Sequence, residues 1–181
     1  MSCTSAEQRH HRGFRTGDYT FFLDKIGPER TPVRAVIQRV LQAEVKIGAE
    51  SVARIDKGML VYLSVGRQDC LKDAEYMAEK MVNLRIFADE AGKMNRSVLD
   101  VGGQLLLVSN FTLHGDCRKG RRPSFDAAAE PAVAQQLYEK VIELIAKQGV
   151  GVQKGVFGEY MHVSSINDGP VTFLLDSTRL F

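Results

Sequence analysis

The sequence predicts an α+β fold on three observations. Short runs rich in β-branched residues predict about six to eight strands, and two longer segments with apolar residues every three to four positions predict helices. The helices are too few to alternate with strands along the whole chain, which argues against a regular α/β architecture. With 181 residues, the chain is long enough for one domain with a substantial core.

The predicted strands of the first half differ in how their faces are covered. The segment from Ala43 to Ile47 alternates apolar and polar residues, as is typical of a strand with one buried face. The segment from Met59 to Val65 is almost continuously apolar, so we expect both of its faces to be covered. The predicted strands are Arg34–Val40, Ala43–Ile47, Ser51–Ile55, Met59–Val65 and Arg85–Phe87.

Two segments have the period of an amphipathic helix, Leu71–Leu84 and Pro131–Lys147. The glycines and polar residues of 89–103 predict a loop between them. The remaining predictions are a strand over Gln104–Leu113, a loop over residues 114–122 and a strand-like region over Val150–Leu175.

Residues 1–32 differ in composition from the rest of the chain. The stretch from Met1 to Asp18 is polar, so we expect an N-terminal extension that is disordered or loosely packed, followed by a domain over residues 33–181. A mitochondrial presequence would be rich in arginine and poor in acidic residues. Glu7 and Asp18 oppose that interpretation.

Composition sets limits on partners and compartment. A formal net charge of +2 neither requires nor excludes a nucleic-acid partner, which would have to be met by a local patch. Cys3, Cys70 and Cys117 are far apart, which argues against a disulfide framework or a zinc site and favours the reducing cytosol. No apolar run is long enough to cross a membrane.

Two short motifs carry the functional prediction. Asn167–Thr172 reads Asn-Asp-Gly-Pro-Val-Thr, the composition of a turn that leads into a strand. Far upstream, Ser109–Leu113 reads Ser-Asn-Phe-Thr-Leu. Together they resemble the paired signature of the D-aminoacyl-tRNA deacylases, Ser-Gln-Phe-Thr-Leu and Asn-x-Gly-Pro-Val-Thr.

The resemblance covers the chain from Val33 to about Ser177. One departure is Asn110, where the family has Gln, and its shorter side chain puts any contact of that amide in question. An animal branch of the family edits certain L-aminoacyl-tRNAs and carries an altered first motif, whereas Ser109–Thr112 is closer to the D-specific branch. Further stretches similar to the family are Arg34–Val40, Asn83–Phe87, Arg122–Phe125 and Phe157–Met161.

The resemblance implies an enzyme with a twisted, largely antiparallel, barrel-like sheet and two main helices. It implies hydrolysis of the ester between a D-amino acid and tRNA by a homodimer, without a metal ion or another cofactor. In the family the Gly-Pro bond is cis and enters the active site of the partner subunit, where it excludes L side chains by steric hindrance. Glycine is achiral, so glycyl-tRNA should be accepted too. The catalytic residues that the resemblance predicts are Ser109, Phe111, Thr112, Gly169 and Pro170.

The residues leave two catalytic mechanisms open. A side-chain nucleophile would need a base beside it, and His114 follows Thr112 on the same face if the strand continues. No acidic residue is placed to orient that histidine, and no G-x-S-x-G motif occurs. The alternative uses the main-chain N–H groups near Phe111 and Thr112 to stabilise an oxyanion. The resemblance implies in addition that the ribose hydroxyl of the tRNA assists the attack by water.

Other residues receive roles in substrate binding from the same resemblance. Arg39 is expected to orient the Gly-Pro loop, and the aromatic side chains are expected to form the pocket of the terminal adenosine. These predicted substrate-binding residues are Arg39, Asn110, Phe157, Gly158, Met161 and Asn167. A basic cluster is expected to bind the phosphates of the acceptor stem, unless it is only a solvated loop. It consists of Arg118, Lys119, Arg121 and Arg122.

Two rival functions remain at this point. One is a related deacylase that edits mischarged L-aminoacyl-tRNA. The other is a nucleic-acid-binding module that keeps the fold and has lost turnover.

Overall fold

The computed structural model describes residues 31–181, which form one compact unit. The extension predicted for residues 1–32 therefore lies outside the described residues, apart from Thr31 and Pro32. The elements are β1 (Arg34–Ile47), β2 (Glu50–Ile55), β3 (Gly58–Ser64), α2 (Leu71–Asn83), β4 (Phe87–Ala88), β5 (Met94–Arg96), β6 (Gln104–Ser109), the 3₁₀ turn η1 (Phe111–His114), α3 (Pro131–Lys147), β7 (Gly151–Lys154) and β8 (His162–Asp176).

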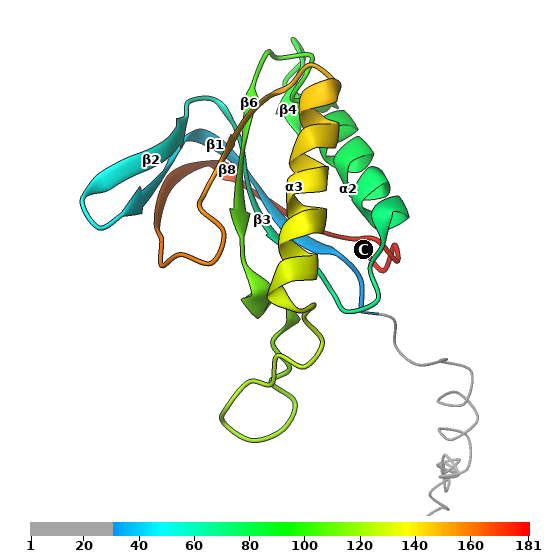
Figure 1. Cartoon of the computed structure of the whole chain (residues 1–181). Helices are drawn as coiled ribbons and strands as arrows, with labels where there is room; N and C mark the ends of the chain where they lie inside the picture. The colour runs from blue at the N-terminus through cyan, green and yellow to red at the C-terminus, as the bar shows by residue number, and fades with distance from the viewer. Residues whose placement is uncertain (1–30) are drawn as a thin grey trace, which may run out of the picture. The chain divides into compact units, whose positions relative to one another are not determined.

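The long strand β1 organises the sheet. It pairs antiparallel with β8 along nearly its whole length. On its other edge it pairs antiparallel first with β3 and then with β2. Beyond β3 the sheet continues with β6 and β7, both in parallel pairing. The mixed sheet curls into a nearly closed barrel-like form (Figure 1).

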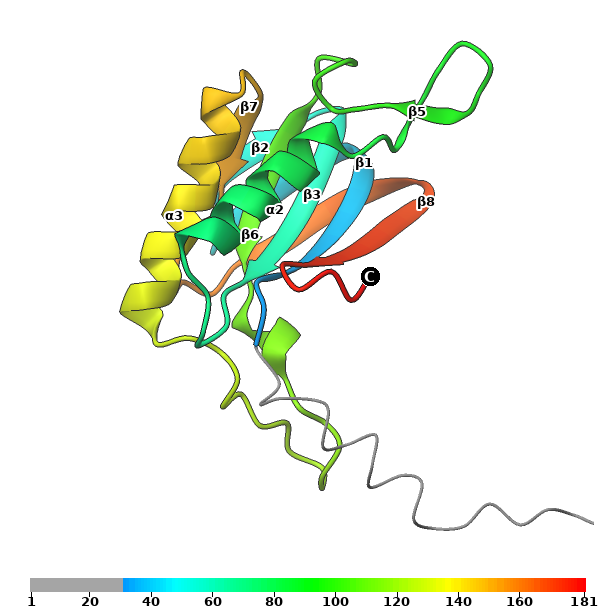
Figure 2. The same ribbon diagram turned by 90° about the vertical axis from the view of Figure 1, so that its right-hand side faces the viewer.

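The α+β class with two main helices is confirmed, but the chain also contains β-α-β units that the sequence analysis did not predict. Parallel strands need a crossover connection, and here α2 lies between β3 and β6 in the chain while α3 lies between β6 and β7. Figure 2 shows both helices on the same face of the sheet. They leave the opposite face of β3 and β6 free to pack against β2.

Side chains of β3 and β6 are buried on both faces. Met59 and Leu105 belong to the core that packs against the helices, whereas Leu60 and Leu106 belong to a second core with β1 and β2. This confirms the expectation for Met59–Val65. Within residues 31–181, no helix combines the length and hydropathy needed to cross a bilayer.

Two local predictions for β1 and β8 are wrong. Arg34–Val40 and Ala43–Ile47 are one strand, because β8 continues to pair with β1 across exposed Leu41 by shifting its register. Asn167–Thr172, predicted as a turn that leads into a strand, is instead an irregularity inside β8, where the pairing with β1 skips residues 168–171.

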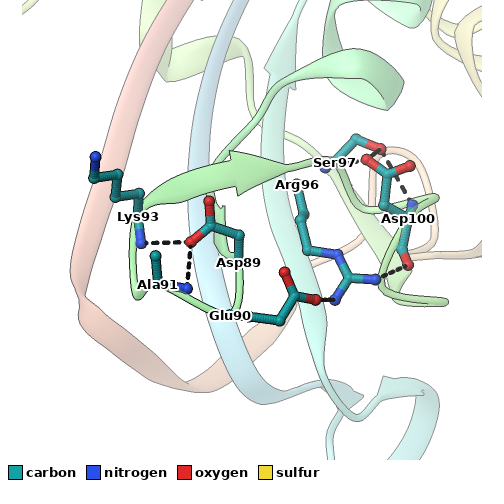
Figure 3. Close-up of polar contacts among 7 residues, drawn as sticks. All are labelled: Asp89, Glu90, Ala91, Lys93, Arg96, Ser97 and Asp100. Carbon is teal, nitrogen blue, oxygen red and sulfur yellow. Dashed lines mark hydrogen bonds and ion pairs between the residues drawn. The ribbon is translucent and has the colours of Figure 1, made fainter.

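Residues 89–103 are mostly loop, as predicted, but they include a short strand, β5, that pairs with β4. Figure 3 shows the side chains that order this hairpin. Asp89 Oδ1 accepts hydrogen bonds of 2.9 Å from the backbone N–H groups of both Ala91 and Lys93. Asp100 Oδ2 accepts from Ser97 N and Oγ at 2.8 Å. These donors hold the pKa of both carboxyl groups below the ordinary value, so one carboxylate orders the turn before β5 and the other orders the turn after it.

Candidate active site

A cleft of about 960 Å³ opens between the end of β6, the loop before α3 and the loop before β8. It is large enough for an amino acid together with a nucleoside. Seven of the residues predicted for the site line it: Ser109, Asn110, Phe111, Thr112, Phe157, Gly158 and Met161. The first motif and the Phe157–Met161 stretch thus meet in one cleft, although they are far apart in the sequence.

The first motif ends its strand earlier than predicted. β6 stops at Ser109, and Asn110 N–H donates to the Leu63 carbonyl oxygen at 2.9 Å. Phe111 then begins the 3₁₀ turn η1, whose first hydrogen bond runs from Leu113 N–H to the Asn110 carbonyl oxygen at 3.2 Å. Within residues 31–181, the N–H groups of Phe111 and Thr112 donate to no acceptor, as expected for the first residues of a helical turn.

The Thr112 hydroxyl is engaged by Asn110. Thr112 Oγ1 donates to Asn110 Oδ1 at 2.5 Å. The amide at position 110, which is shorter than the Gln of the family motif, therefore has a partner inside the motif itself. The hydroxyl's proton points to an amide oxygen, which is not a base, so this contact does not activate Thr112 as a nucleophile.

His114 does not pair with Thr112, because η1 replaces the predicted strand and turns the two side chains apart. The imidazole is 2% exposed, with Nδ1 2.6 Å from Ser64 Oγ and Nε2 2.9 Å from the Pro32 carbonyl oxygen. Burial lowers the pKa of His114, and Arg34 lowers it further, whereas the hydrogen bond to Pro32 opposes the shift. His114 is therefore a neutral, buried ring with both nitrogens occupied, and the Thr–His pair is not formed.

Aromatic side chains form much of the cleft wall. Phe111 packs edge-on against Phe125, with ring centroids 5.0 Å apart. The ring centroid of Phe157, also in the cleft lining, lies 5.9 Å from that of buried Tyr138, whose hydroxyl donates to the Leu107 carbonyl oxygen. Phe111 is nevertheless 58% exposed, so its ring offers a free surface for stacking.

The second motif does not line this cleft. Gly169 and Pro170 are exposed, joined by a cis peptide bond as the resemblance implied. Arg39 Nε donates to the Asp168 carbonyl oxygen at 3.1 Å, and Asn167 Oδ1 accepts from Val171 N–H at 2.8 Å. Arg39 and Asn167 therefore shape the loop that presents Gly169-Pro170, and neither of them lines the cleft of its own chain.

The basic cluster lies on the loop that follows η1 and is exposed, and none of its four residues lines the cleft. In Figure 1 this loop projects beyond the start of α3. Arg118 pairs with Asp116, with 2.9 Å between Nη2 and Oδ2, and the pair lowers the pKa of Asp116 to about 2. Lys119, Arg121 and Arg122 complete the cluster.

Several residues of the cleft were not predicted. Arg67 adds a cation and Tyr160 an aromatic ring that is 80% exposed. Tyr160 and Phe125 lie within stretches that already resembled the family, which was a usable signal. Arg67 follows β3 without any motif, and only the fold brings it to the cleft. Among the described residues, no group of His, Cys, Asp or Glu side chains is arranged to hold a metal ion.

Comparisons with known proteins identify the family of this chain. Residues 36–176 match the model of the D-Tyr-tRNA(Tyr) deacylase family. A D-aminoacyl-tRNA deacylase of Fervidobacterium nodosum is 54% identical over 149 residues, covering 82% of this chain and 100% of that protein. A D-aminoacyl-tRNA deacylase of Thermus aquaticus is 56% identical over 147 residues, covering 81% and 97%.

Two solved structures are also similar. One, described as a c-Myc DNA unwinding element binding protein, has a TM-score of 0.74 and 39% identity, covering 78% of this chain and 97% of that one. The other, described as a probable eukaryotic D-amino acid tRNA deacylase, has a TM-score of 0.70 over 80% of this chain and 99% of that one. At 18% identity the latter supports the fold alone.

The fold and the relatives together define a hydrolase of the deacylase class. The chain belongs to the D-Tyr-tRNA(Tyr) deacylase family.

Proposed function

We propose that this protein hydrolyses the ester bond of D-aminoacyl-tRNA, releasing the D-amino acid and tRNA, as a chirality check in translation in the cytosol. One observation carries the proposal: residues Ser109–Thr112 of the first motif and the Phe157–Met161 stretch line the same cleft. The high identity to curated D-aminoacyl-tRNA deacylases supports the same reaction.

The main chain supplies the catalytic donors in this mechanism. The N–H groups of Phe111 and Thr112 are available to bind the oxyanion that develops when water attacks the ester carbonyl. No side chain beside Thr112 can take its proton, because its hydroxyl donates to Asn110 and His114 is engaged elsewhere. The substrate's own ribose hydroxyl then assists the attacking water.

The active unit is a homodimer in which Gly169-Pro170 of one subunit enters the cleft of the other. The loop is exposed, held in shape by Arg39 and Asn167, and absent from the lining of its own cleft. Backbone atoms at Gly169 would leave no room for an L side chain beside the α-carbon, so selectivity is steric and D-aminoacyl and glycyl esters are both accepted.

A panel of charged tRNAs tests the reaction. Full-length protein is incubated with D-Tyr-tRNA, Gly-tRNA, L-Tyr-tRNA and L-Ala-tRNA, and the remaining ester is measured over time. Hydrolysis of the first two alone supports the proposal. Hydrolysis of L-Ala-tRNA in preference to D-Tyr-tRNA would instead assign the protein to L-aminoacyl editing.

A non-catalytic role is the second candidate, and the relative described as a DNA unwinding element binding protein favours it. Binding of uncharged tRNA or duplex DNA without turnover of any ester in the panel would support this candidate and overturn the first. The basic cluster would serve either function, so its presence does not discriminate between them.

A further inference from the structure

The η1 turn depends on contacts outside itself for its position. It has only four residues, and a single 3₁₀ turn has little intrinsic stability. Its first residues line the cleft, whereas its last residue, His114, is buried and does not line the cleft. Arg34 Nη1 donates to the Leu113 carbonyl oxygen at 3.1 Å, which ties the end of the turn to the start of β1.

The partners of His114 determine its tautomer. The Pro32 carbonyl oxygen can only accept, so Nε2 carries the proton that spans the 2.9 Å distance. In the neutral ring Nδ1 is then the acceptor, and Ser64 Oγ donates to it across 2.6 Å. The imidazole thus connects β3, which carries Ser64, to the segment before β1, which carries Pro32.

Pro32 itself is held firmly. Val33 N–H donates to Ser177 Oγ at 3.2 Å, and Ser177 N–H donates to the Val33 carbonyl oxygen at 3.0 Å. Next to it, Thr31 packs directly on Gly66, where a β-carbon would lie 2.2 Å from the Thr31 carbonyl oxygen. The acceptor for His114 is therefore fixed by two separate parts of the fold.

We propose that His114 is a positioning residue of the deacylase site, which bridges Pro32 and Ser64 and so fixes η1 with the N–H groups of Phe111 and Thr112 in the cleft. This proposal rests on the function proposed above. Pro32 lies before Val33, where the resemblance begins, and before residues 36–176 that match the family model, so the bridge includes a part of this chain that the family match does not cover.

The test uses the full-length chain with His114→Leu and His114→Gln, and with the exposed His162→Gln as the matched control. Leucine removes both hydrogen bonds, whereas glutamine keeps an N–H donor and an acceptor. We expect His114→Leu to slow single-turnover hydrolysis of D-Tyr-tRNA about tenfold or more and to leave KM within about twofold, because a displaced oxyanion donor weakens only transition-state binding. His114→Gln should recover most of the loss, and His162→Gln should match the wild type.

A second measurement does not depend on activity. Long-range ¹H–¹⁵N spectra of the full-length protein at pH 7.5 should show His114 as a neutral ring protonated on Nε2, with the control variant identifying the signals of His162. A charged ring or a proton on Nδ1 would overturn the proposal. So would a folded His114→Leu variant with the wild-type rate, or a His114→Gln variant that folds and is no faster than His114→Leu. A wild type that leaves D-Tyr-tRNA intact would refute the proposed function, while the spectra would still test the bridge.

Discussion

A single nitrogen of Arg39, Nε, contacts both the main-chain carbonyl group and the side-chain carboxylate of Asp168. Arg39 Nε lies 3.1 Å from the Asp168 carbonyl oxygen and 3.0 Å from its Oδ2. Arg39 Nη1 also donates to the Ile86 carbonyl oxygen at 2.6 Å, and the side chain is 13% exposed. Since Asp168 directly precedes Gly169, this guanidinium links the loop that presents Gly169-Pro170 to the body of the fold.

Replacing Arg39 by lysine should therefore impair the active site. Lysine keeps the positive charge but lacks the planar guanidinium with its several N–H donors, so it cannot hydrogen-bond to Asp168 and to the Ile86 carbonyl oxygen at the same time. We expect Arg39→Lys to lower the rate of D-Tyr-tRNA hydrolysis about tenfold and to weaken discrimination against L-Tyr-tRNA. Arg54→Lys, at an exposed position on β2, is the control. Equal rates for the two variants would show that Arg39 does not position the loop.

The basic cluster should affect binding rather than chemistry. Arg118 is partly neutralised by Asp116, so Lys119, Arg121 and Arg122 are the cations to remove. Their replacement by alanine should raise KM for charged tRNA. The slope of log KM against the logarithm of the salt concentration should also decrease, by about 0.7 to 0.9 for each phosphate that the variant no longer neutralises. Alanine at Lys57, Lys72 and Lys93, three exposed lysines outside the cleft, changes the net charge equally. If both triple variants shift KM alike, the cluster has no specific role.

Acid should destabilise the fold through His114. Because the pKa is lowered in the folded state, the unfolded chain binds more protons below about pH 6.5. The contribution of the neutral ring is complete above that pH and is lost as the pH falls toward the folded pKa. Between pH 7.5 and 5.5, the unfolding free energy from urea titrations should fall more for the wild type than for His114→Gln. Parallel declines would contradict the lowered pKa of His114.

The sequence predicted the elements of this fold better than their connections. Periodicity located α2, α3 and β3, because burial of a regular face leaves a repeating pattern. It could not show that β3 and β6 run parallel, since pairing direction depends on where the α2 crossover returns. The end of β6 was missed for a related reason: Leu113 and His114 continue a strand-like pattern in the sequence, but the η1 turn, not a strand, buries His114.

The site was predicted from motifs rather than from geometry. Ser109–Thr112 and Phe157–Met161 line one cleft, and Gly169 lies outside that lining, which is compatible with the two-subunit hypothesis. Arg67, Ser64 and the Pro32 carbonyl group have no motif of their own. Their roles arise from tertiary contacts that no local pattern encodes.

Truncation should locate the true start of the domain. We expect a chain that begins with methionine at position 30, and so retains Thr31 and Pro32, to keep the wild-type melting temperature and activity. A chain that begins with methionine in place of Val33 lacks the acceptor of His114, so it should hydrolyse D-Tyr-tRNA more slowly. Thermal unfolding and single-turnover rates are measured for both. Equal rates would place the domain boundary at residue 33, as the sequence alone suggested.

Thr112→Ala and Gly169→Ala distinguish the two catalytic mechanisms. A threonine nucleophile would make Thr112→Ala inactive, because the covalent step could not occur. If the main chain acts, Thr112→Ala keeps every N–H group, loses only the hydrogen bond to Asn110 and should slow hydrolysis no more than about threefold. Gly169→Ala should be severe although it removes no reactive group. Single-turnover deacylation of D-Tyr-tRNA measures both, after circular dichroism confirms folding.

The Gly169→Ala variant needs a further control, because the substitution also affects the loop of its own chain. Gly169 has φ +139°, and an added β-carbon would lie 2.6 Å from Val171 Cγ2, so alanine distorts its own loop. Dimers that mix two variants separate the two effects. The first subunit carries Ser109→Phe, which blocks its cleft and leaves its loop intact. The second carries Gly169→Ala, which distorts its loop and leaves its cleft intact. In a mixed dimer, the intact loop of the first subunit meets the intact cleft of the second. Equal, randomly exchanged subunits should therefore recover about a quarter of wild-type activity. Without recovery in dimers shown to have exchanged, Gly169 would act within its own chain, and the composite site proposed for this deacylase would be wrong.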